Sequence, residues 1–61
     1  MENCKIVMDL RDGTGRIRGY SQLISKKTRD KEILELTLNI MHETRELMKL
    51  LDRVESELHG N

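Results

Sequence analysis

The feature that most constrains the fold is a broad apolar stripe within residues 31–59. Its members recur every three or four residues, as on one side of an α-helix, with Glu43 as a polar gap. The stripe consists of Ile33, Leu36, Ile40, Leu47, Leu50 and Val54. A second stripe one position over widens it beyond what one partner helix would cover; it adds Thr37, Thr44, Leu51 and Leu58. We therefore expect a helix buried on two sides, with one neighbour from its own chain and another from a second molecule.

The size of the chain supports self-association. A domain of 61 residues buries little of its own surface and commonly needs a disulfide, a metal ion or a second chain. Cys4 is the only cysteine, which excludes an intrachain disulfide and fits a reducing, cytoplasmic location. His42 and His59 with Cys4 match no metal-ligand spacing, so we expect neither a metal site nor a cofactor. A second copy is the remaining source of stability.

Charge and turn residues indicate a single helical-hairpin domain over residues 1–61. Residues 1–31 carry eight basic and four acidic side chains, or +4, and residues 32–61 carry three basic and seven acidic, or −4. This contrast modestly favours antiparallel halves, although two ordinary solvated faces would look the same. We expect helices over about 3–26 and 31–59 with a tip at 26–30, Thr28 or Asp30 as N-cap and Gly60 as the C-terminal stop.

The N-terminal half allows two interpretations. Spacings of four and three residues along this segment are typical of a helix in a bundle core. They connect Ile6, Leu10, Gly13, Ile17, Tyr20 and Ile24. Gly13, Gly15 and Gly19 oppose a helix, at about 1 kcal/mol each. The alternative is a β-hairpin with strands 6–11 and 16–20 around an Asp12-Gly13 turn, but an isolated two-stranded hairpin is marginal in water. We favour the helix, with a kink allowed at 12–15.

These elements predict an all-α fold, a helical hairpin that dimerises into a four-helix bundle with coiled-coil spacing. The expected dimer core draws on both helices. It consists of Ile6, Leu10, Ile17, Tyr20, Ile24, Ile33, Leu36, Ile40, Leu47, Leu50, Leu51 and Val54.

The first helix also resembles a known family. Residues 9–11 read Asp-Leu-Arg and residues 17–20 read Ile-Arg-Gly-Tyr. In type and spacing they resemble the His-Glu-Leu-Arg…Ile-Arg-Gly-Tyr motif in the dimerisation and phosphoacceptor (HisKA-type) domain of sensor histidine kinases. Residues 43–54 are similar to that domain's second helix. The resemblance covers roughly residues 6–56 and implies a dimeric four-helix bundle.

The departures from this family concern its chemistry. Met8 occupies the position of the phosphoaccepting histidine, and a thioether cannot carry a phosphoryl group. Gly13 replaces the family's proline, and Glu46 replaces an arginine. The resemblance therefore implies a protein that is not an enzyme and binds a response regulator or a sensor kinase to modulate phosphotransfer. By position, the expected partner surface is Asp9, Asp12, Arg16, Tyr20, Met41, His42 and Arg45.

Three other functions are considered. His42 could serve as the phosphoacceptor of a histidine phosphotransferase, although Glu43 beside it points about 100° away on a helix. The bundle could be a structural or adaptor module with a partner outside signalling. Basic residues within 11–31 suggest nucleic acid, but zero net charge and a single aromatic residue argue against it. No apolar run approaches the length of a membrane span, and we expect no membrane partner.

Overall fold

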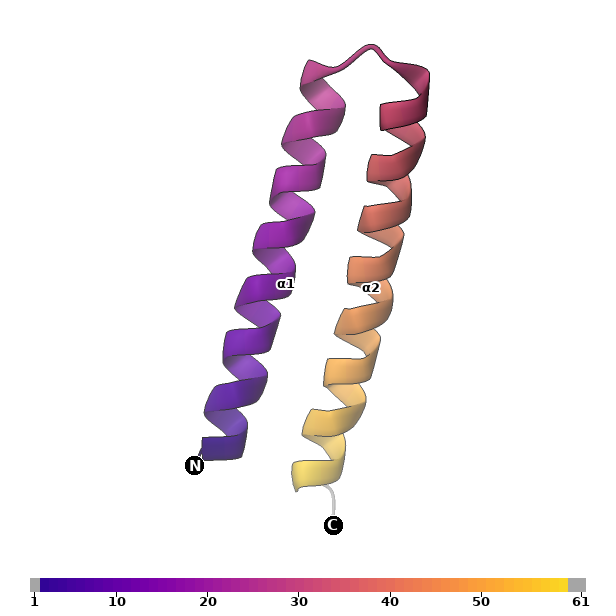
Figure 1. The fold of residues 1–61 in the computed structure, drawn as a ribbon. Coiled ribbons are helices and arrows are strands. Elements are labelled where there is room, and N and C mark those ends of the chain that lie inside the picture. The colour runs from indigo at the N-terminus through magenta and orange to yellow at the C-terminus, as the bar shows by residue number, and fades with distance from the viewer. Residues whose placement is uncertain (1, 60–61) are drawn as a thin grey trace.

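The computed structural model describes residues 2–59, which form two antiparallel helices, α1 (Glu2–Lys27) and α2 (Lys31–His59) (Figure 1). The all-α hairpin expected from the sequence is confirmed. The alternative of two N-terminal strands is wrong, because residues 6–20 lie within one continuous helix that includes Gly13, Gly15 and Gly19. The hairpin is a rod of 47 × 15 × 10 Å. Both helix bounds lie within one residue of the expected ranges, and the non-helical tip is residues 28–30.

The tip is shaped by short side-chain caps. The Thr28 N–H donates to the carbonyl of Ile24 at 3.0 Å, which closes the last turn of α1. Of the two expected N-caps, Asp30 has this role: its Oδ1 accepts the Ile33 N–H at 3.1 Å. Thr28 Oγ1 accepts the Asp30 N–H at 3.1 Å and orders the turn between the helices. The expected C-terminal stop, Gly60, lies outside the described residues.

The two helices meet along a seam of small side chains. On α1 its buried residues are Val7, Thr14 and Ser21, and on α2 they are Thr37, Thr44 and Leu51. Each set has a spacing of seven, which is the heptad repeat of paired helices. Only Val7 and Leu51 in the seam are both buried and apolar. The hairpin interior is therefore narrow and contains little hydrophobic surface.

The hydroxyl groups of the three buried threonines are satisfied within their own helices. Thr14 Oγ1 donates to the carbonyl of Leu10 at 2.7 Å, and Thr44 Oγ1 donates to that of Met41 at 2.7 Å. Thr37 Oγ1 makes the equivalent bond to Leu34 at 2.9 Å. Because these bonds stay within a helix, they do not fix one helix on the other. What holds the seam is the close approach that small side chains permit.

An ion-pair cluster supports the open end of the hairpin. Arg11 Nη2 donates to Asp52 Oδ1 and to Glu55 Oε1, both at 2.6 Å. These two hydrogen bonds raise the pKa of the Arg11 guanidinium. In this cluster a basic residue of the first half of the chain pairs with two acidic residues of the second half, in line with the charge contrast between the halves.

Candidate functional site

The most prominent surface is a set of large apolar side chains that the hairpin leaves exposed. Each of them is between 39% and 63% exposed. Met8, Leu23, Leu38 and Leu58 are also exposed but are not counted in this set, which consists of Ile6, Leu10, Ile17, Tyr20, Ile24, Ile33, Leu36, Ile40, Leu47, Leu50 and Val54. We call this set the apolar face. It contains every residue of the expected dimer core except Leu51, which is buried in the hairpin's own seam.

The members of the apolar face on both helices lie on one side of the hairpin. Four of the eleven directly precede a seam residue, as Ile6 precedes Val7 and Leu50 precedes Leu51. Six others lie three residues after one, which is a net rotation of about 60° in the same sense as one step back. One step back along an α-helix rotates a side chain by about 100°. Because α1 and α2 are antiparallel, the same step rotates in opposite senses when both are viewed from one end. Both apolar stripes therefore turn toward the same side of the rod.

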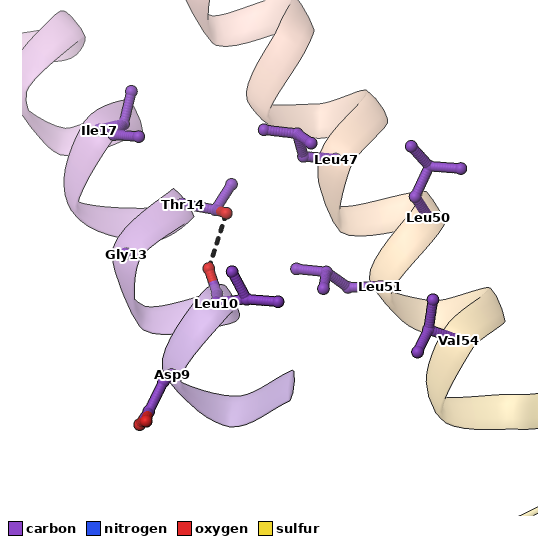
Figure 2. A pocket seen from close by; sticks show the side chains of 9 residues that line it. All are labelled: Asp9, Leu10, Gly13, Thr14, Ile17, Leu47, Leu50, Leu51 and Val54. Carbon is purple, nitrogen blue, oxygen red and sulfur yellow. Dashed lines mark hydrogen bonds between the residues drawn. The ribbon is translucent and has the colours of Figure 1, made fainter. Parts of the chain in front are cut away.

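A groove in the apolar face shows that the two stripes meet. It has a volume of about 380 Å³. Its walls and floor come from both helices: Asp9, Leu10, Gly13, Thr14, Ile17, Leu47, Leu50, Leu51 and Val54 (Figure 2). Seam residues Thr14 and Leu51 lie between the two helices, and Asp9 points away from α2. The lining is almost entirely apolar, which suits the side chains of another helix better than a polar ligand.

Gly13 deepens this groove. It occupies a position in the apolar stripe of α1 where every other member is a large side chain. A Cβ built at Gly13 would lie 3.7 Å from Arg16 Nη2, an ordinary van der Waals contact. Space is therefore available at Gly13, and the missing side chain leaves a notch that a side chain of a partner can fill.

A second groove lies toward the tip. Its volume is about 480 Å³. It is lined by Tyr20, Leu23, Ile24, Lys27, Thr28 and Ile33. It too combines residues of both helices, so the apolar face extends from the open end of the hairpin to its tip.

The residues of the expected partner surface lie on different sides of the hairpin and do not form one continuous surface. Asp9 and Arg16 are exposed at the outer border of the apolar face, each one residue before one of its members. Met41 is half-buried beside the seam. His42 and Arg45 are exposed and, by helical phase, turn toward the opposite side of α2. Asp12 and Tyr20 are also exposed.

The position of the phosphoacceptor in the resembled family is accessible in this chain. Met8 is 62% exposed, on a turn of α1 that also carries Arg11. A histidine at this position would be open to a second protein, whereas the thioether of Met8 provides no nucleophilic nitrogen. His42 is exposed on α2 and makes no side-chain hydrogen bond with the described residues.

The remaining candidate residues form no site with a recognisable chemistry. Cys4 Sγ lies 3.5 Å from His59 Nε2 at the open end of the hairpin. Within residues 2–59, no group of three or more metal-ligating side chains comes together. Neither described helix has a segment long and apolar enough to cross a membrane.

Sequence reasoning found the α2 half of the seam as a second stripe that includes Thr37, Thr44 and Leu51, but it missed the α1 half. Val7, Thr14 and Ser21 do not stand out in an apolar pattern, because two of them carry hydroxyl groups. Their exact spacing of seven, matched by Thr37, Thr44 and Leu51, is the signal that could have identified them.

Comparisons with models of protein families, with curated proteins and with solved structures find no match. The likeness to histidine kinases thus stays a prediction based on the residues themselves.

Proposed function

We propose that this chain is a dimerisation module. Two hairpins join through their apolar faces into a four-helix bundle, which acts without catalysis in two-component signalling by binding a response regulator or a sensor kinase. The main observation that supports the proposed dimer is the apolar face itself. Its large side chains share one side of the hairpin, and the seam that joins the helices has only two buried apolar residues.

The exposed area is consistent with an interface of ordinary size. The accessible surface of the hairpin is 5177 Å². A compact monomer of 7.2 kDa would expose about 4100 Å². The excess of about 1000 Å² is close to the roughly 800 Å² that each partner contributes to a stable interface. A second copy laid on the apolar face would remove this excess.

Stability supports the same proposal. Ordering the backbone costs about 1–2 kcal/mol per residue, and this cost must be offset mainly by apolar burial. Val7 and Leu51 alone cannot offset it for two helices of 26 and 29 residues. Pairing of two apolar faces would supply a core of normal composition for a four-helix bundle. Folding and dimerisation would then be a single event.

The signalling role is supported by the residue pattern on this scaffold. Arg11 and the segment 17–20 resemble the family in type and spacing, and they lie on a helix of a hairpin, as the resemblance implies. Met8 in place of the histidine supports a role without phosphoryl transfer. A response regulator would contact the exposed Asp12 and His42, which lie away from the apolar face.

The substitution Met8→His tests this proposal directly. If the scaffold presents position 8 as a phosphoacceptor, this variant gains an acid-labile phosphoryl group from ATP when incubated with the catalytic domain of a histidine kinase. The wild-type protein gains none and instead changes the phosphotransfer rate of a kinase–regulator pair. Met8→His combined with His42→Ala and His59→Ala serves as the control for labelling at the two other histidines.

Two outcomes would overturn the signalling role. One is a Met8→His protein that is dimeric but stays unlabelled, together with unchanged phosphotransfer in the presence of the wild-type protein. The other is acid-labile label on His42 of the wild-type protein after incubation with a phosphodonor. The latter would make the chain a histidine phosphotransferase, a function for which the exposure of His42 is the favourable observation.

A further inference from the structure

Met8 is a large side chain that belongs neither to the seam nor to the apolar face. It is 62% exposed on α1. It directly follows the seam residue Val7, and one step forward along a helix turns a side chain by about 100°, here to the side opposite the apolar face. A methionine in a helical protein commonly fills gaps between apolar side chains. Neither packing within the hairpin nor the proposed dimer accounts for Met8.

We propose that Met8 is a reversible oxidation site for a peroxide, and that its sulfoxide weakens the binding of a signalling partner while the dimer stays intact. The effect on the partner rests on the proposed function. The oxidation site itself rests on the exposure and the chemistry of this side chain.

The reaction is a two-electron oxygen transfer to the thioether. A lone pair of Met8 Sδ attacks one oxygen of hydrogen peroxide, and an S–O bond forms as the O–O bond breaks. The hydroxide that leaves takes the proton of the new S–OH group and becomes water. Sulfur is thereby oxidised to the sulfoxide and the peroxide is reduced. Methionine sulfoxide reductases reverse the change with electrons from a thiol.

Exposure selects Met8 among the methionines within residues 2–59. Met41 and Met48 are half-buried on α2, beside the seam. Peroxide reaches their sulfur atoms less easily, and a sulfoxide there would place a polar oxygen among packed side chains. The new oxygen on Met8 stays in water, so the hairpin accepts it without loss of stability. Oxidation at Met8 therefore changes a surface and not a core.

The surface that changes includes Asp12. Met8 and Asp12 are four residues apart and are therefore neighbours on one face of α1. Asp12 is one of the exposed residues at which we place the response regulator. A partner that covers Asp12 also covers the apolar thioether of Met8. After oxidation it must desolvate a sulfoxide oxygen instead, and we expect binding to weaken about tenfold.

Cys4 is the other oxidisable side chain near this site. It lies four residues before Met8, is half-buried, and has its Sγ 3.5 Å from His59 Nε2. A thiol is oxidised to sulfur acids or a disulfide rather than to a sulfoxide. The substitution Cys4→Ser therefore removes the thiol chemistry and leaves that of Met8 in place.

Peptide mapping after treatment with hydrogen peroxide tests the oxidation site. Trypsin cleaves after lysine and arginine, which puts the methionines in separate peptides: 1–5, 6–11, 32–45 and 46–49. In the wild-type and Cys4→Ser proteins, peptide 6–11 should gain one oxygen before peptides 32–45 and 46–49 do. Earlier oxidation of either later peptide overturns the inference. So does dissociation of the dimer when only peptide 6–11 is modified, whereas a protein that is monomeric before treatment overturns the proposed dimer and not the oxidation site.

Phosphotransfer in a kinase–regulator pair tests the effect on the partner. After oxidation at Met8, about tenfold more wild-type protein should be needed for the same effect, and a methionine sulfoxide reductase should restore the original requirement. Met8→Leu should act alike before and after peroxide. Met8→Gln, whose amide oxygen imitates the sulfoxide, should need as much protein as the oxidised wild type. An oxidised wild type as effective as the reduced one overturns the inference alone. A reduced protein without any effect overturns the proposed function together with it.

Discussion

Truncation of Leu50 gives the sharpest test of the apolar face, because the chain supplies a matched control. Leu50 and Leu38 lie on the same helix and are 52% and 61% exposed in the single hairpin. Leu50 lines the groove of the apolar face, whereas Leu38 lies on the other side of α2. A monomeric hairpin would tolerate Leu50→Ala and Leu38→Ala equally. A dimer formed through the apolar face would not.

The expected difference follows from the exposed half of Leu50. Full burial of a leucine side chain is worth about 1.5–3 kcal/mol, so the half still exposed contributes about 1 kcal/mol per copy, or about 2 kcal/mol per dimer. Leu50→Ala should therefore raise the dimer dissociation constant about 30-fold. Leu38→Ala should leave it within about twofold. Sedimentation equilibrium over a range of concentrations measures both, and equal constants for the two variants would refute the reasoning.

Three further predictions concern stability. If folding and dimerisation are one event, the midpoint of thermal unfolding, followed by circular dichroism, rises with protein concentration; a midpoint independent of concentration would contradict the proposal. Gly15→Ala and Gly19→Ala, where an added Cβ meets nothing within 4 Å, should each stabilise the helix by about 0.5–1 kcal/mol in urea unfolding, and destabilisation would be inconsistent with a regular α1. Arg11→Gln should lower the unfolding midpoint through loss of the pairs with Asp52 and Glu55. Because the pKa of Arg11 is raised, this contribution is present at neutral pH and is lost only when strongly alkaline solution deprotonates the guanidinium. The difference from the wild type should thus be alike at pH 7 and pH 9 and smaller in 1 M salt; a difference that salt does not reduce would argue against an ionic origin.

The hairpin could be predicted from the sequence because several local signals agree. Apolar spacing defined α2, and the short polar segment ending in Asp30 defined the tip. The N-terminal helix was harder to predict, because three glycines oppose it locally, yet α1 is continuous and packs along α2. Such tertiary contacts commonly override intrinsic propensity.

The division between seam and apolar face could not be read from apolar spacing alone. Two stripes that are shifted by one residue have the same helical period, so Leu50 and Leu51 look equivalent in the sequence. Their difference comes from packing: small residues such as Thr37 and Thr44 let the helices approach closely, and the larger side chains are displaced to one side. The size of the side chains, rather than their polarity, determines which stripe becomes the interior of the hairpin.

The same division separates the two kinds of partner within the proposed function. A response regulator that contacts Asp12 and His42 leaves the apolar face occupied by the second copy, so the complex contains the intact dimer. A sensor kinase that pairs its own dimerisation helices with this chain must cover Leu47, Leu50 and Val54, and it therefore displaces the second copy. Native mass spectrometry of mixtures distinguishes these cases by stoichiometry. Two chains per complex indicate docking on the bundle, whereas one chain per kinase subunit indicates exchange of helices. Leu50→Ala should weaken exchange and dimerisation together, because both depend on the same apolar face.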